Sequence, residues 1–155
     1  MAIEIERKYL INQNKWDNFP KPEGQLFRQG YILKDPEKTI RVRVTDTTAY
    51  LTIKGASIGA TRTEFEYEIP KEEGIELLDN FAVSELSKIR YKIPHINKLW
   101  EVDVFLGNNK GLIVAEIELD SEEEYFELPE WISIEVTGDN KYYNSNLSAN
   151  PFKNW

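Results

Sequence analysis

The chain has 155 residues, a mass of 18.1 kDa and a formal net charge of −8, which fits one domain and excludes the broad basic surface of a nucleic-acid or anionic-membrane binder. It contains no cysteine and a single histidine, His95, so disulfides, thiolate metal sites, cysteine nucleophiles and multi-histidine metal sites are excluded. No apolar run reaches the roughly 20 residues of a membrane span, and the N-terminus lacks the apolar stretch of a signal peptide, so a cytoplasmic protein is expected.

Strand patterns dominate the chain. Alternation with period two and enrichment in Ile, Val, Tyr and Phe predict nine strands separated by short polar turns. The expected strands cover residues 2–10, 25–34, 38–46, 49–55, 62–69, 86–95, 98–106, 112–120 and 132–138. Their close spacing is typical of consecutive antiparallel hairpins. No repeat, low-complexity tract or linker divides the chain, so residues 1–155 are expected to form a single domain.

Helical patterns are few and short. Residues 71–80 follow Pro70, carry acidic residues in the first turn and place apolar side chains at helical spacing, which predicts one helix. Residues 12–19, 121–127 and 141–149 could each add one or two turns. A mainly β fold with a few short helices is therefore expected.

Ionised side chains occupy one face of nearly every expected strand. Residues i, i+2 and i+4 of a strand share a face. In the first strand, Glu4, Glu6 and Lys8 therefore lie opposite the apolar side chains of that strand. The same rule places these residues on the charged faces of later strands: Arg41, Arg43, Lys54, Arg62, Glu64, Glu66, Glu68, Lys88, Arg90, Lys92, Glu101, Asp103, Glu116, Glu118, Asp120 and Glu135.

The charged face allows two interpretations. An open antiparallel sheet with one solvated face is the simpler one. However, like charges two residues apart, such as Arg41 and Arg43, repel each other unless counter-charges lie nearby. About eight strands suffice to close a barrel with a narrow interior. If the charged face points inward, carboxylates suited to Mg²⁺ or Mn²⁺ lie beside bases suited to phosphate oxygens, which indicates a metal-bound polyphosphate.

An ordered series of short motifs runs through essentially the whole chain. It begins with Glu4-Ile5-Glu6-Arg7-Lys8, an ExExK pattern. The later motifs are Gln29-Gly30-Tyr31, Arg41-Val42-Arg43, Thr52-Ile53-Lys54, Glu64-Phe65-Glu66, Lys88-Ile89-Arg90-Tyr91, Trp100-Glu101-Val102-Asp103, Ala115-Glu116-Ile117-Glu118 and Tyr142-Tyr143-Asn144. Together they resemble the CYTH superfamily, the triphosphate tunnel metalloenzymes. The resemblance implies a closed, eight-stranded antiparallel barrel that forms a triphosphate tunnel, with a few short helices packed outside.

The resemblance also implies roles for the charged residues. One or two divalent ions, Mg²⁺ or Mn²⁺, would be held by Glu4, Glu6, Glu116 and Glu118. The triphosphate would be bound by Lys8, Arg41, Arg43, Lys54, Lys88 and Arg90. The catalytic set would be Glu64, Glu66, Asp103 and Lys88, with the three acids binding or orienting a second metal and its water, and Glu64 or Glu66 as general base. Residues 139–149 resemble a C-terminal helix that closes one end of the tunnel, and Tyr142 could lie in the core or at the tunnel mouth.

The implied activity is divalent-metal-dependent hydrolysis of a small triphosphate. The short chain favours inorganic tripolyphosphate, cleaved to pyrophosphate and phosphate, because few segments remain to build a base or thiazolium pocket. Class IV adenylyl cyclase, thiamine triphosphatase and RNA triphosphatase activities stay open. A non-catalytic polyphosphate-binding barrel is an alternative that the acid set disfavours, because carboxylates beside an anion need metal. Neither a nucleic-acid polymer nor a membrane is an expected partner, and the sequence leaves the oligomeric state open.

Overall fold

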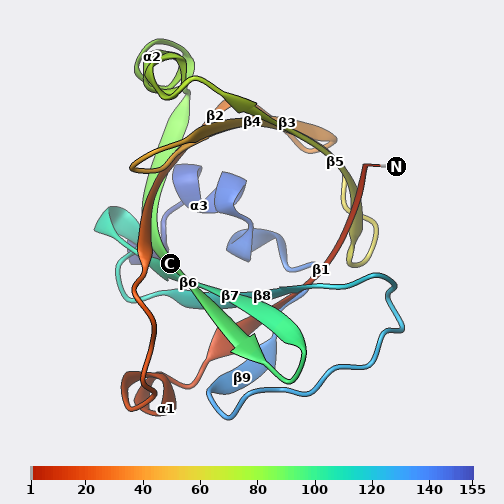
Figure 1. Cartoon of the computed structure of the whole chain (residues 1–155). Coiled ribbons are helices and arrows are strands. Elements are labelled where there is room, and N and C mark those ends of the chain that lie inside the picture. The colour runs from red at the N-terminus through yellow and green to blue at the C-terminus, as the bar shows by residue number, and fades with distance from the viewer. Residues whose placement is uncertain (1) are drawn as a thin grey trace.

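Nine strands form one continuous antiparallel sheet in this protein, whose computed structural model describes residues 2–155. The strands span Ile3–Ile11 (β1), Gln25–Asp35 (β2), Lys38–Val44 (β3), Ala49–Gly55 (β4), Thr61–Ile69 (β5), Ser84–His95 (β6), Lys98–Phe105 (β7), Ile113–Glu118 (β8) and Ile132–Glu135 (β9). The strand order is β5-β4-β3-β2-β6-β7-β8-β1-β9, and a further pairing of β1 with β5 closes the ring (Figure 1). The expected eight-stranded closed barrel is therefore confirmed, with β9 added beside β1.

Three short helices accompany the barrel, namely α1 (Gln13–Asp17), α2 (Lys71–Phe81) and α3 (Asn144–Ala149), together with 3₁₀ turns at Gly107–Asn109, Asn140–Tyr142 and Phe152–Asn154. The helix expected over 71–80 is confirmed as α2. Its Leu78 is buried on the outer side of the sheet with Val42, Val44 and Ala49. No helix within residues 2–155 is both long enough and apolar enough to cross a membrane.

Two segments differ from the sequence prediction. Residues 121–127 form turns and extended chain instead of a helix, because their polar groups are anchored separately: the Glu122 carbonyl accepts from Arg7, and the Glu122 carboxylate accepts from Thr61. The strand expected over 132–138 ends at Glu135. Beyond it, the Thr137 hydroxyl replaces a backbone carbonyl as the acceptor for the Lys8 amide.

The barrel wall has its main apolar core on the outside. Outward-facing Tyr9 and Trp100 pack against Trp16 of α1 and Trp131 of the loop before β9, with ring centroids between 5.3 and 6.0 Å apart in three of the pairs. Aromatic pairs at such distances add stability beyond the buried area. This outer core leaves most of the inner face of the strands to the ionised side chains.

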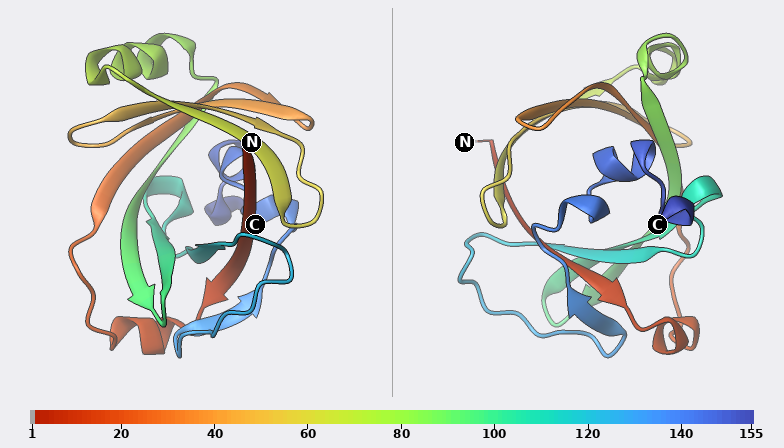
Figure 2. Two further views of the ribbon diagram at one scale, coloured as in Figure 1. Left: turned by 45° about the vertical axis from the view of Figure 1, so that its right-hand side comes forward. Right: turned by 180° about the vertical axis from the view of Figure 1, so that it is seen from behind.

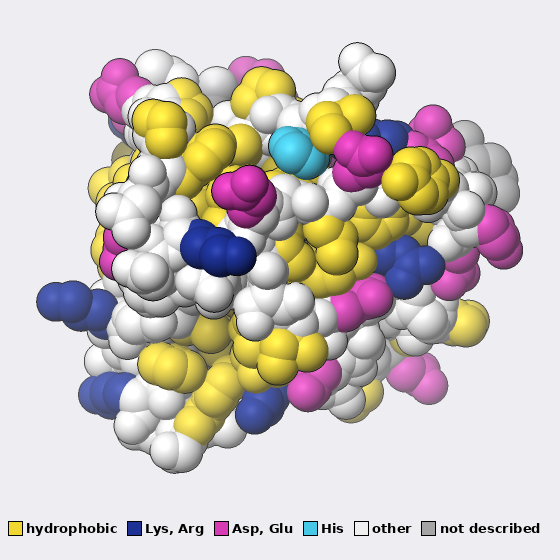
Figure 3. Space-filling model, turned by 90° about the horizontal axis from the view of Figure 1, so that it is seen from below, with side chains coloured by type: hydrophobic (Ala, Val, Ile, Leu, Met, Phe, Trp, Pro, Cys, Tyr) yellow, Lys and Arg dark blue, Asp and Glu magenta, His cyan; other side chains and the backbone are white. Residues whose placement is uncertain are grey.

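The C-terminal segment, which includes α3, lies inside the ring of strands (Figures 1 and 2), so α3 is an exception to the expected packing of the short helices outside the barrel. Its Tyr142 and Leu147 are buried against Leu86 and Phe105, which point into one end of the barrel. The segment thus fills that end with an apolar plug, and Tyr142 belongs to the core. Basic side chains are scattered over the face seen from below (Figure 3), in keeping with the absence of a broad basic surface on this side.

Candidate active site

A cavity of about 200 Å³ lies within the barrel. Seven acids and seven bases line it, so the charged lining is formally neutral: Glu4, Glu6, Glu64, Glu66, Glu101, Glu116, Glu118, Lys8, Arg41, Arg43, Lys54, Arg62, Lys88 and Arg90. The alternation of the strands sends these side chains inward and most of the apolar ones outward, apart from those such as Leu86 and Phe105 that contact the C-terminal segment. The interpretation of an open sheet with a solvated charged face is therefore wrong.

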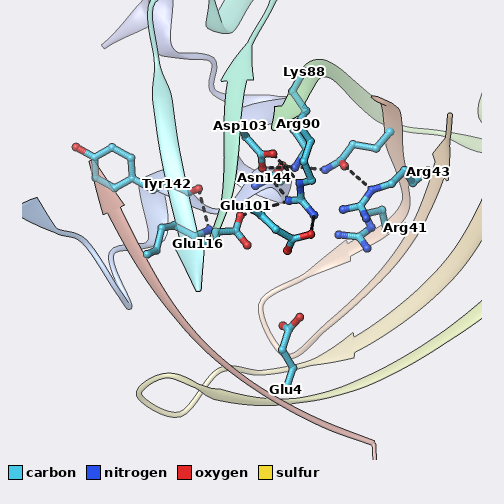
Figure 4. A network of polar contacts seen from close by, with 12 residues as sticks. Glu4, Arg41, Arg43, Lys88, Arg90, Glu101, Asp103, Glu116, Tyr142 and Asn144 are labelled. Carbon is cyan, nitrogen blue, oxygen red and sulfur yellow. Dashed lines mark hydrogen bonds and ion pairs between the residues drawn. The ribbon is translucent and has the colours of Figure 1, made fainter. Parts of the chain in front are cut away.

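Twelve of the thirteen residues expected at the site line this cavity. The exception is Asp103, which is fully buried behind two of the cations. Lys88 Nζ lies 2.7 Å from Asp103 Oδ2, and Arg90 forms a bidentate pair with the same carboxylate at 2.7 and 2.9 Å (Figure 4). Asp103 therefore orients Lys88 and Arg90 and does not itself face the cavity.

The charge of Lys88 depends on its burial and on the Asp103 carboxylate, which it shares with Arg90. Burial alone would raise the pKa of Asp103, but Arg90 and then Lys88 outweigh burial and hold that pKa below its ordinary value. Burial lowers the pKa of Lys88 to about 7, with Asp103 opposing and Arg90 reinforcing the shift. Because arginine stays charged over the whole physiological range, it is Lys88 that can lose its proton near neutral pH.

Two arginines on β3 form the neighbouring basic wall. Arg41 donates to the Thr52 hydroxyl at 3.1 Å and pairs with Glu66 at 3.4 Å. Arg43 donates through Nε to Gln29 Oε1 at 3.2 Å and lies 4.7 Å from the centre of the Phe27 ring. These contacts occupy only part of each guanidinium, so both retain N–H groups for an anion.

Acidic side chains gather on the opposite part of the wall, where β1, β5 and β8 meet. Lys54 Nζ bridges Glu4 Oε1 and Glu64 Oε2 at 3.0 Å each. Burial raises the pKa of Glu6 well above its usual range, and the charges of Glu116 and Glu4 add to the rise. Glu118 has a raised pKa for the same reasons, burial first and then Glu4. Burial alone would also raise the pKa of Glu4 and Glu116, but Lys54 holds the pKa of Glu4 below its ordinary value, and Lys8 with Arg90 does the same for Glu116. The shortage of positive charge in this region is therefore confined to Glu6 and Glu118.

The chemistry of this acidic region fits a hard divalent cation. Within residues 2–155, no three carboxylate or histidine side chains already form a metal-binding cluster. The donors are nonetheless all carboxylate oxygens, the type that Mg²⁺ and Mn²⁺ prefer. A cation would also offset the repulsion that raises the pKa of Glu6. Glu4, Glu6, Glu116 and Glu118 are the residues that would hold it.

Several lining or network residues had no role assigned from the sequence. Gln29 and Asn144 form hydrogen bonds to the cations, and Arg62 and Tyr143 line the cavity beside Lys8. The alternation places Arg62 on the charged face of its strand, but none of the motifs assigned it a role. Asn144 belongs to the C-terminal segment, and the alternation of the strands cannot predict that this segment lies inside the barrel.

Comparison with known proteins gives concordant matches. The model of the CYTH domain matches residues 2–148. The chain is similar to a protein of Acetivibrio thermocellus named inorganic triphosphatase, with 47% identity over 100% of this chain and 99% of that protein. It is also similar to the inorganic triphosphatase of Nitrosomonas europaea, with 32% identity over 94% of this chain and 96% of the relative. The crystal structure of the inorganic triphosphatase NE1496 matches with a TM-score of 0.65 and 31% identity over 96% and 95% of the two chains.

Proposed function

The chain belongs to the CYTH domain family, and from that premise we propose that it is a divalent-metal-dependent inorganic triphosphatase that cleaves tripolyphosphate to pyrophosphate and phosphate. The observation that carries the proposal is the cavity within the barrel, which has seven carboxylates and seven bases on its wall. A site for an anion alone gains nothing from so many carboxylates, whereas a site for an anion that enters with metal requires them. The names of the two relatives support the same activity.

The dimensions of the cavity favour a small substrate. Its volume of about 200 Å³ is below the usual range of roughly 300–1,000 Å³ for sites that enclose drug-sized ligands. Among residues 2–155, Tyr31 and Tyr143 are the only aromatic side chains that line it. The centre of the Tyr143 ring already lies 5.3 Å from Lys8 Nζ and 5.9 Å from the Arg62 guanidinium. Within this cavity, a nucleobase or thiazolium ring therefore has little apolar wall to pack against. A second cavity of about 250 Å³ shares Thr39 and Tyr143 with it and is lined further out by Pro36, so the comparison of substrates includes ATP and thiamine triphosphate.

In the proposed mechanism, the basic wall binds the non-bridging phosphate oxygens. Arg41 and Arg43 present guanidinium groups suited to bidentate contacts with phosphate. Lys88 and Arg90, both oriented by Asp103, stabilise the charge that develops during transfer of the phosphoryl group. A divalent cation held by the four acidic ligands would neutralise phosphate charge and acidify water.

Glu64 is the residue that we assign as general base. Burial raises the pKa of Glu64, and Glu4 adds to the rise while Lys54 opposes it, so this carboxylate is a better proton acceptor than an ordinary glutamate. Glu66 also lines the cavity, but its carboxylate accepts from Arg41 and from the Thr52 hydroxyl. We therefore assign Glu66 to the orientation of Arg41.

The direct test measures phosphate release from tripolyphosphate, ATP and thiamine triphosphate in Mg²⁺ or Mn²⁺, with cyclic AMP measured in parallel. We expect tripolyphosphate to be the best substrate, and Glu4→Ala and Glu6→Ala each to abolish metal-dependent turnover. Glu68→Ala is the matched control, because Glu68 is exposed on β5 and does not line the cavity. Cyclic AMP as the main product, or tight tripolyphosphate binding without turnover, would replace the proposal with a cyclase or a binding protein.

A further inference from the structure

Two uncharged side chains, Gln29 on β2 and Asn144 at the start of α3, connect the cations of neighbouring strands. Arg43 Nε donates to Gln29 Oε1 at 3.2 Å. Gln29 Nε2 donates to Asn144 Oδ1 at 2.9 Å, and Lys88 Nζ donates to the same oxygen at 2.7 Å (Figure 4). The two amides thus form a continuous hydrogen-bonded path from Arg43 to Lys88.

The amide of Gln29 has one orientation that satisfies both of its ends. Its oxygen faces the Arg43 donor and its nitrogen faces the Asn144 acceptor. With the amide reversed, two N–H donors would oppose each other in a fully buried position, at the cost of a desolvated and unpaired polar group. The path is therefore directional, and it depends on both partners being present.

These hydrogen bonds decide which donors remain for a ligand. The Lys88 ammonium has three protons, of which one is donated to Asp103 and one to Asn144, so a single proton is left for the cavity. The Nε–H of Arg43 is engaged by Gln29, so the terminal nitrogens of the guanidinium are left for a bidentate contact. Without the path, each head group could rotate about its remaining contacts.

We propose that Gln29 and Asn144 are positioning residues, which hold the Arg43 guanidinium and the Lys88 ammonium in the mutual arrangement that transfer of the phosphoryl group requires. The inference rests on the proposed triphosphatase activity. It also gives the apolar plug a role at the site, because the buried Tyr142 and Leu147 fix the segment that carries Asn144. Neither amide touches the reacting atoms in this assignment.

Near-isosteric variants test the proposal kinetically. Asn144→Leu keeps the branched shape of the asparagine side chain, Gln29→Met keeps the length of the glutamine side chain, and both remove the hydrogen bonds. For tripolyphosphate hydrolysis we expect kcat to fall about tenfold or more, because slight misplacement of catalytic groups is costly. KM should change by less than about threefold, because the other cations still bind the anion. The kcat of the double variant should be little lower than that of the more impaired single variant, since either change breaks the same path. The proposal would be overturned if the two changes lowered kcat independently of each other, or if they raised KM and left kcat unchanged.

A matched control separates positioning from general loosening of α3. Ser148 lies on the same helix, and its hydroxyl pairs with that of Ser84 on β6 at 2.8 Å, away from the cavity lining. Ser148→Ala removes this contact between α3 and the barrel, and we expect kcat within about twofold of the wild type. A loss of kcat as large as that of Asn144→Leu would show that docking of the helix, and not the amide path, is what matters.

A spectroscopic readout tests the path without any turnover. Asn144→Leu removes no atom that contacts Arg43, so a shifted Nε–Hε resonance of Arg43 in this variant reports transmission through Gln29. We expect that shift in Asn144→Leu and its absence in Ser148→Ala. An unchanged Arg43 resonance would overturn the path. An inactive wild-type protein would instead overturn the proposed function, and the Arg43 resonance would still decide whether the path exists.

Discussion

At the scale of single residues, the site contains side chains that each pair with two groups of opposite charge. Asp103 holds Lys88 and Arg90 together, and Lys54 bridges Glu4 and Glu64. Strand alternation predicted that these side chains share one face. It could not predict that Asp103 would lie behind the cations, because side-chain length and local crowding decide which groups reach the cavity.

Lys88 should make anion binding depend on pH near neutrality. Its pKa of about 7 in the fold lies below the ordinary value of a lysine, so the free site loses this cation as pH rises through about 7. Affinity for tripolyphosphate should therefore fall between pH 7 and 9, by at most about tenfold per pH unit for one proton. Calorimetry on the wild type and on Lys88→Met in the same buffers checks this, since the titration of the substrate is common to both. The prediction would be contradicted if the affinities of the wild type and of Lys88→Met changed with pH in parallel.

Ionisation of Glu6 should lower the free energy of unfolding. Burial and the neighbouring Glu116 raise its pKa in the fold above the unfolded value, so the stabilising effect of its proton is lost as pH rises through the folded pKa. Glu6→Gln should therefore raise Tm at pH 8 in EDTA, with a smaller gain at pH 5, while it abolishes metal-dependent turnover. Scanning calorimetry at the two pH values measures the difference. Glu68→Gln serves as the exposed control, and an equal gain there would refute the argument.

At the scale of elements, periodicity predicted the strands and α2 well and the irregular segments poorly. Alternation is a local signal that each strand carries in its own residues. The path of residues 121–127 depends instead on distant partners such as Arg7 and Thr61, and the position of α3 depends on an apolar pocket at the end of the barrel. Contacts of this kind have no local pattern in the chain.

The packing of α2 on the sheet should make Gly74 intolerant of a side chain. A Cβ at this position would lie 2.6 Å from the Ala49 Cβ and 3.1 Å from the Val44 Cγ2. Gly74→Ala should therefore lower the free energy of unfolding by about 1–3 kcal/mol, despite the better helix propensity of alanine. Denaturant unfolding measures this, with the exposed Asn80→Ala on the same helix as control. A stabilised Gly74→Ala variant would show that α2 moves away from the sheet at little cost.

At the scale of the whole molecule, the fold separates two distributions of charge. The cavity lining is formally neutral, so the net charge of −8 belongs to the rest of the chain. An acidic exterior disfavours long polyanions, whereas a neutral lumen in which acids and bases pair with one another accommodates a small anion together with its metal. Net charge alone could not predict this arrangement, because it depends on closure of the barrel.

Closure of the barrel rests on its shortest seam, which should also be its weakest. β1 and β5 share three residue pairs, whereas β2 and β6 share seven. Local opening requires little free energy where few contacts hold an element. The seam amides of Glu6 and Glu64, bonded to Ala60 and Ala2, should therefore exchange with solvent faster than the β2–β6 amides.

Ligand binding should tighten this seam, because the Lys54 bridge between Glu4 and Glu64 spans it and all three residues line the cavity. Tripolyphosphate in EDTA, where metal-dependent turnover is blocked, should slow exchange of the seam amides by at least about tenfold, since a ligand bound only to the closed barrel stabilises that state by mass action. Lys54→Met should speed exchange at the seam and leave the β2–β6 amides unchanged. Hydrogen-exchange NMR resolves both sets of amides. Equal protection of both sets, with and without the ligand, would mean that the barrel opens only by global unfolding.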